Sequence, residues 1–100
     1  SVMQNRFSDG LFILDEPESA LSPQRQLTLL ALMYDRVQNG NTQFLVATHS
    51  PILLTYPEAV IVSFDDPQLP PVSLEETKHY QITHGILTIP ESYWKHLREG

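Results

Sequence analysis

Two segments of the chain hold residues whose types and spacing could perform hydrolysis. An apolar run at residues 11–14 ends in Asp15 and Glu16, and a second apolar run at residues 43–47 ends shortly before His49. A carboxylate in such a place can hold Mg²⁺, and a neighbouring one can orient an attacking water or take its proton. A histidine can bond a phosphate oxygen or the water. The two segments therefore predict parts of a nucleotide-hydrolysing site, although an acidic loop and a histidine that only ends a strand would show the same local pattern.

A strand, a helix and a second strand must position these residues. The run at residues 11–14 is typical of a strand buried on both faces of a parallel sheet. Ser22 suits a helix N-cap and Pro23 the first helical position. Apolar residues then recur at helical spacing, namely Leu27, Leu30, Ala31, Tyr34 and Val37. Residues 43–47 predict a second strand, so we expect a right-handed βαβ unit. Open parallel sheets bind ligands at the carboxyl ends of their strands, where the candidate residues fall.

The rest of the chain is predicted to form short elements. Ser73, with Glu76 three residues later, is typical of a capping box that begins a helix over residues 74–87. The other expected elements are the tail of a helix at residues 2–7, a helical turn after Pro51, a third strand at 59–64, a loop at 65–71 and a last helix at 91–99.

Composition limits the possible classes of function. A chain of 100 residues is one domain at most, and its formal net charge of −6, with only six Lys and Arg, disfavours a nucleic-acid footprint. No apolar run approaches the roughly 20 residues that span a membrane. The absence of cysteine leaves no disulfide framework. We therefore expect a cytoplasmic protein without membrane contact.

One part of a nucleotide site is absent from the sequence. No Gly-x-x-x-x-Gly-Lys-Ser/Thr phosphate loop occurs, and the four glycines are too scattered to form one. We therefore expect residues 1–100 to be the C-terminal part of an ATPase, inactive alone and completed by an N-terminal portion that carries the phosphate loop.

The two segments together resemble the ABC-type ATPases. Residues 11–22, Leu-Phe-Ile-Leu-Asp-Glu-Pro-Glu-Ser-Ala-Leu-Ser, are similar to a Walker B motif that runs into a D-loop, and residues 47–51, Ala-Thr-His-Ser-Pro, are similar to the segment of the switch histidine. The similarity is greatest to the stand-alone, AAA-like and ABC-related ATPases found mostly in bacteria. It implies the C-terminal half of an α/β fold, a three-layer P-loop NTPase-like architecture with a mostly parallel sheet.

The resemblance implies ATP and Mg²⁺ as cofactors and gives roles to the matching residues. Asp15 would act on Mg²⁺, Glu16 would be the catalytic glutamate for water, and His49 would sense the γ-phosphate. The D-loop would cross to a second subunit and help to bind the nucleotide through Ser19, Ala20, Leu21 and Ser22. Such heads sandwich two nucleotides between them, so a homodimer is implied. Transporter ATPases usually carry Asp at the position of Ser22, which favours the stand-alone or DNA-repair-like branch.

An alternative function is a regulatory or interaction domain that kept the sheet and lost catalysis. A phosphate loop upstream would support the ATP hydrolase, and its absence would support this alternative.

A further expectation concerns the sheet. In the family pattern the phosphate-loop strand lies between residues 43–47 and 59–64. Without it, we expect either self-association through unpaired strand edges and bare apolar faces, or a rearranged sheet in which residues 59–64 fill the gap.

Overall fold

The computed structural model describes residues 10–64 and 70–100, and the chain divides into two compact units, Ser1–Tyr56 and Pro57–Gly100. The expected helix tail at residues 2–7 and most of the expected loop at 65–71 lie outside the described residues. Each unit combines helices with a small sheet, so the α/β class is confirmed. No described helix has both the length and the apolar character that crossing a membrane requires.

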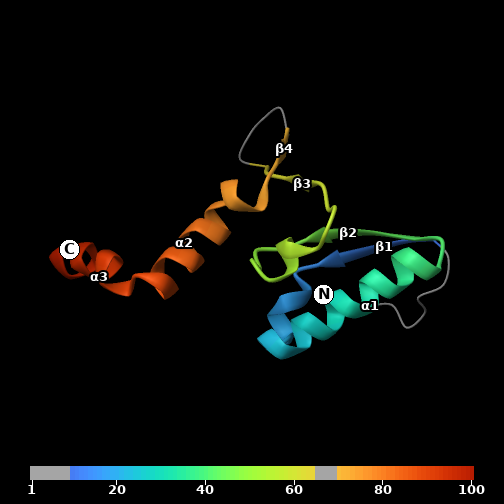
Figure 1. The fold of residues 1–100 in the computed structure, drawn as a ribbon, viewed down its shortest axis with the longest axis horizontal. Helices are drawn as coiled ribbons and strands as arrows, with labels where there is room; N and C mark the ends of the chain where they lie inside the picture. The colour runs from blue at the N-terminus through green and yellow to red at the C-terminus, as the bar shows by residue number, and fades with distance from the viewer. Residues whose placement is uncertain (1–9, 65–69) are drawn as a thin grey trace. The chain divides into compact units, whose positions relative to one another are not determined.

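The first unit is the predicted strand–helix–strand arrangement (Figure 1). Strands β1 (Gly10–Asp15) and β2 (Thr42–Ala47) pair in parallel, with Gly10 opposite Thr42 and Asp15 opposite Ala47. Helix α1 (Pro23–Asn39) connects them. The Ser22 hydroxyl accepts a hydrogen bond from the Arg25 backbone N–H at 3.2 Å, which is the expected N-cap. Short 3₁₀ helices η1 (Pro17–Ala20) and η2 (Leu53–Thr55) follow the two strands, and η2 is the helical turn expected after Pro51.

The core of this unit lies between the sheet and α1. Leu14 is only 1% exposed and packs with Leu29, Met33 and Leu53. Phe44 and Val46 of β2 pack against the same cluster. The buried face of α1 differs from the predicted one, because Leu27, Tyr34 and Val37 are exposed while Gln26 is buried. Apolar residues occupy several sides of this helix, so spacing alone did not indicate which side meets the sheet.

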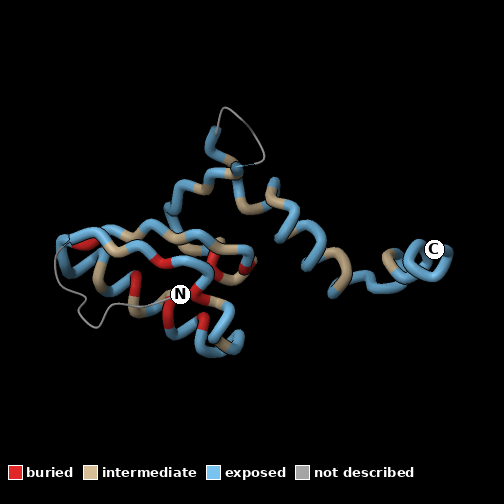
Figure 2. The backbone as a smooth tube through the Cα atoms, turned by 180° about the vertical axis from the view of Figure 1, so that it is seen from behind, coloured by how far each residue is buried: buried red, intermediate tan, exposed pale blue. Residues whose placement is uncertain are grey.

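Within the described residues only one face of the parallel sheet is covered, so β1 is not buried on both faces as its apolar run predicted. The other face is bare, as we expected for a chain without the phosphate-loop portion. Leu11, Ile13 and Leu45 are 58%, 64% and 61% exposed, while their neighbours in each strand alternate toward the core. A single crossover helix can cover one face only. The uncovered apolar face is therefore the side that a further layer would have to cover. Figure 2 colours the backbone by burial and marks exposed residues in pale blue.

The second unit departs more from expectation. The third strand shortens to β3 (Ile61–Val62) and pairs antiparallel with β4 (Pro71–Val72), in a sheet separate from β1 and β2. Among the described residues of this segment, the third strand neither fills the gap as a parallel strand nor stays unpaired. The partners are close in the chain, since Ile61 pairs with Val72 and Val62 with Pro71, so loop closure costs little. Pro71, which the sequence predicts to lie in the loop, belongs to β4.

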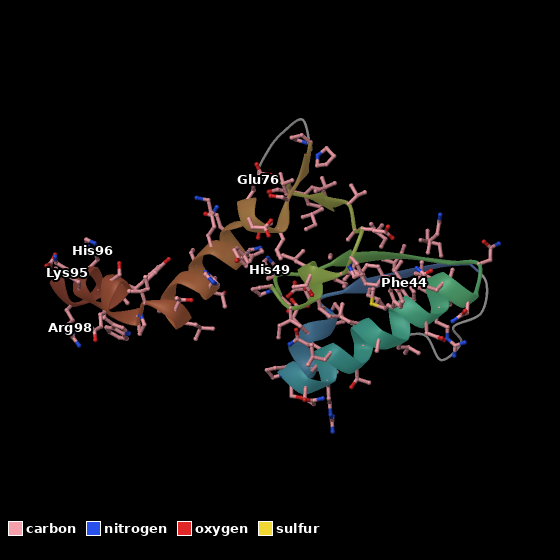
Figure 3. The ribbon with its side chains drawn as sticks, in the orientation of Figure 1. Phe44, His49, Glu76, Lys95, His96 and Arg98 are labelled. Carbon is pink, nitrogen blue, oxygen red and sulfur yellow. The ribbon has the colours of Figure 1, made fainter. Side chains whose placement is uncertain are left out.

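The predicted helix over residues 74–87 is two elements. The Ser73–Glu76 capping box is present but begins the short η3 (Leu74–Glu76), and the Thr77 hydroxyl then caps α2 (Lys78–Thr88). Helix α3 (Pro90–Glu99) ends with His96 and Arg98 in its last turn (Figure 3). Gly85 lets Tyr93 approach, since a Cβ at this position would clash with the phenol ring. No described residue of this unit is buried, so its helices share no core comparable to that of the first unit.

Candidate functional site

The two candidate segments leave the parallel sheet side by side. The Glu16 backbone N–H donates to the Ala47 carbonyl at 2.7 Å, which carries the β1–β2 ladder one residue past the strand end. The chain then turns at Glu16, whose backbone is left-handed (φ 48°, ψ 54°), into the short helix η1. Glu16 and His49 consequently meet at the carboxyl edge of the sheet, as the sequence predicted.

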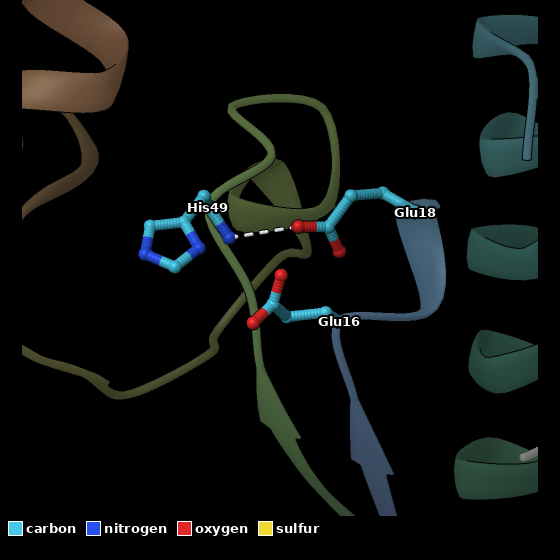
Figure 4. Close-up of side chains that lie close together, drawn as sticks. All are labelled: Glu16, Glu18 and His49. Atoms are coloured by element: carbon cyan, nitrogen blue, oxygen red, sulfur yellow. Dashed lines mark hydrogen bonds between the residues drawn. The ribbon is translucent and has the colours of Figure 1, made fainter. Parts of the chain in front are cut away.

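A third residue, Glu18, joins the two segments. Its carboxylate accepts one hydrogen bond from the Thr48 hydroxyl at 2.7 Å and another from the His49 backbone N–H at 2.9 Å, one on each oxygen. Figure 4 shows the second of these bonds, with the Glu16 carboxylate beside it. Glu18 and His49 are 31 residues apart in the sequence, so this contact exists only because β1 and β2 pair in their observed register.

These contacts set the charge state of Glu18. Partial burial by itself raises the pKa of the carboxyl. The hydrogen bonds from the Thr48 hydroxyl, the His49 backbone and its own backbone, with the charge of His49, outweigh that effect and hold the pKa of Glu18 below its ordinary value. Glu18 is therefore a carboxylate at neutral pH and accepts both bonds as a charged group, which makes them stronger than neutral ones.

Ser50, at the end of the segment Thr48–Ser50, forms a second set of hydrogen bonds with α1 and η2. The Ser50 hydroxyl donates to Gln26 Oε1 at 2.5 Å and accepts from the Leu53 backbone N–H at 3.3 Å. Gln26 Nε2 in turn donates to the Leu21 carbonyl at 3.3 Å. Ser50 and Gln26 are both buried. The histidine-bearing segment is thus fixed at one end to η1 through Glu18 and at the other to α1 through Gln26.

Glu16, Glu18 and His49 form a group that could hold a cation. One ligand atom from each lies within 4.8 Å of the others, and Glu16 and His49 are exposed while Glu18 is half-buried. Asp15, the predicted metal ligand, is not a member of this group. It is the last residue of β1, exposed and opposite Ala47, one residue from the group by sequence.

The predicted D-loop residues divide into two pairs. Ser19 and Ala20 are exposed on η1. Leu21 packs against the core, and Ser22 caps α1. Leu21 and Ser22 therefore have structural roles in this chain, while Ser19 and Ala20 of η1 are the D-loop residues that are exposed together.

Sequence reasoning gave no role to Glu18 or Gln26, although Glu18 lies within the quoted residues 11–22 and Gln26 follows them in the helix. The available signal for Gln26 was its position one turn before Leu29 and Leu30, a polar residue on the face that turns toward the core. Glu18 carried a weaker signal, a carboxylate two residues past Glu16 across a proline. Its partners lie on another strand, which no local pattern indicates.

A parallel βαβ unit with carboxylates and a histidine at its carboxyl edge defines the class, an AAA-type, P-loop ATPase-like nucleotide-binding domain. The chain belongs to the family described as "AAA domain, putative AbiEii toxin, Type IV TA system", which matches residues 4–55. The matched residues include β1, α1, β2 and the whole candidate site, and they end one residue before the end of the first unit. No curated protein and no solved structure matches the chain.

Proposed function

We propose that this chain carries the water-activating part of an ABC-type ATP hydrolase, completed by a portion of the protein that holds the phosphate loop. The observation that supports this best is the meeting of Glu16 and His49, with ligand atoms within 4.8 Å of each other. An oxygen atom between two such groups can lie at a hydrogen-bonding distance of about 2.8 Å from each. A water or a γ-phosphate oxygen suits that position.

Glu16 is the residue proposed to act on the water. Its exposed carboxylate can orient the attacking water and accept its proton. Its left-handed backbone (φ 48°) is uncommon for a residue with a side chain and costs about 1–3 kcal/mol. The ladder bond to Ala47 and the turn into η1 hold it there, and strain of this kind is concentrated at functional sites.

Asp15 and Glu16 fit Mg²⁺ better than His49 does, because Mg²⁺ prefers oxygen ligands and usually binds through one or two carboxylates together with substrate phosphates. We assign Asp15 to Mg²⁺, directly or through water, and His49 to the γ-phosphate. The ion would neutralise phosphate charge during transfer. Asp15 is exposed at the end of β1, so a metal ion from solvent can reach its carboxylate.

The exposed part of the D-loop supports a dimeric arrangement in this proposal. Ser19 and Ala20 lie on η1, directly after the catalytic segment, and would face a nucleotide shared with a second copy, with Leu21 and Ser22 supporting them. The phosphate-loop portion would cover the apolar sheet face of Leu11, Ile13 and Leu45, which is open in the described residues.

The test is Glu16→Gln in the intact protein. The swap keeps the shape of the side chain and removes its basicity, so turnover should fall about 10²–10⁴-fold while ATP affinity stays within about threefold. His49→Ala should also lower turnover. Glu58→Gln is a matched control, since Glu58 is likewise an exposed glutamate with a positive φ, 65°. Full activity of Glu16→Gln would contradict the catalytic assignment, and an intact wild-type protein without ATPase activity would favour the interaction-domain alternative.

A further inference from the structure

The contacts of Glu18 go beyond the residues that the proposed function requires. Its two carboxylate oxygens receive one donor each, the Thr48 hydroxyl at 2.7 Å and the His49 backbone N–H at 2.9 Å. The Thr48 oxygen also accepts from the Ser50 backbone N–H at 2.9 Å. Three successive residues of the histidine segment are therefore tied, directly or through Thr48, to one carboxylate.

We propose that Glu18 is a positioning residue that fixes His49 relative to Glu16. The carboxylate lies on η1, two residues after Glu16, and its bond to the His49 backbone connects the two catalytic candidates by a short covalent and hydrogen-bonded path. The Gln26–Ser50 contact supports the far end of the same segment. The effect of Glu18 on turnover rests on the proposed function, but its effect on the position of His49 does not.

The geometry explains why a carboxylate is needed at this position. Both groups that approach Glu18 here are donors, so an acceptor is required on each oxygen. Gln would supply one acceptor and one donor, and only the Thr48 hydroxyl could turn to accept from it. The bond to His49 could then survive in weakened, neutral form. Ala would remove both bonds.

The first experiment follows the His49 amide by NMR in the 100-residue chain. In Glu18→Ala the His49 amide proton should move upfield, and its protection from hydrogen exchange should fall about tenfold to a hundredfold, since bonds to charged groups are the stronger ones. Glu18→Gln should give a smaller change of the same sign. Glu75→Gln is the matched control, an exposed glutamate in the first turn of the 3₁₀ helix η3. An unchanged His49 amide in Glu18→Ala would overturn the proposal.

A second pair of variants tests the hydrogen bond that Thr48 donates to the same carboxylate. Thr48→Val keeps the shape and loses the hydroxyl that donates to Glu18, while Thr48→Ser keeps the hydroxyl. Val should reproduce part of the Glu18→Ala change at His49, and Ser should not. This pair also decides the question if Glu18→Ala fails to fold. Equal His49 signals in the two Thr48 variants would contradict the positioning role.

The last measurement uses the intact protein and separates this inference from the proposed function. Glu18→Ala should lower kcat for ATP about tenfold to a hundredfold with KM within about threefold, because a misplaced catalytic group costs rate more than binding. If Glu16→Gln abolishes turnover and Glu18→Ala leaves it unchanged, the inference fails and the function stands. If wild-type protein has no ATPase activity, the function fails and the His49 amide alone decides whether Glu18 positions that residue.

Discussion

The buried contact between Ser50 and Gln26 allows a prediction whose size can be worked out from the structure. The Ser50 hydroxyl donates to Gln26 Oε1 at 2.5 Å and accepts from the Leu53 backbone N–H at 3.3 Å. Ser50, Gln26 and Leu53 are 6%, 8% and 7% exposed, so little water is available to replace a lost partner. Ser50→Ala removes the hydroxyl and leaves both groups without this bond.

Each buried polar group left unsatisfied costs about 1–3 kcal/mol. The long bond to Leu53 belongs at the lower end of that range, so the two losses together should lower the free energy of unfolding of Ser50→Ala by about 2–4 kcal/mol. Gln26→Met removes the amide from a side chain of similar length and leaves the buried Ser50 hydroxyl and the half-buried Leu21 carbonyl without their bonds. Because water can reach the Leu21 carbonyl, the cost is that of one buried group, about 1–3 kcal/mol. Both are large against a typical stability of about 5–15 kcal/mol.

The double variant Ser50→Ala/Gln26→Met tests whether the two side chains stabilise the fold through their mutual hydrogen bond or independently. Each single change leaves one member of the Ser50–Gln26 bond buried without its partner, whereas the double change removes both members. The double variant should therefore be less destabilised than the sum of the singles by at least about 1 kcal/mol.

The assay is urea unfolding followed by NMR signals from residues 10–56, because the two units of this chain need not unfold together. Ser50→Ala should lower the midpoint by about 1 M or more. Thr28→Ala is the control, since its exposed hydroxyl donates at 3.4 Å to the Gln24 carbonyl and its loss should change stability by less than about 0.5 kcal/mol. Additive effects of the two buried changes, or a Ser50→Ala effect as small as that of the control, would refute the reasoning.

Three other outcomes are expected. Folding lowers the pKa of Glu18, so its stabilisation is fully present above the unfolded-state pKa of about 4.3 and is lost as the pH falls through the lower folded-state pKa. Glu18→Gln should therefore flatten the acid limb of a stability–pH curve, and an unchanged acid limb would contradict this. The 100-residue chain should show no micromolar ATP binding by calorimetry, since it lacks a phosphate loop; a micromolar dissociation constant would contradict this. The chain should self-associate at micromolar concentration through its bare sheet face, and Leu45→Lys, at a position 61% exposed, should weaken light scattering without loss of helix signal; a monomeric wild type would count against it.

The sequence by itself determined the elements whose signals are local. The Ser22 cap, Pro23 and the apolar runs beside Asp15 and Ala47 predicted β1, α1 and β2 nearly to the residue. A strand and its crossover helix depend on contacts and caps within a few residues, which a pattern can show. The meeting of Glu16 and His49 at one edge then followed from parallel pairing alone.

Only the tertiary structure decided the contacts made across the chain. Glu18 reaches His49 because the register places Asp15 opposite Ala47 and because Glu16 turns left-handed, and neither has a signature in local composition. The pairing of β3 with β4 was likewise missed, since a two-residue strand carries too little pattern to indicate its partner. Hydrophobic spacing tells which residues avoid water, but the partner each residue meets depends on loop closure and register, which are properties of the whole fold.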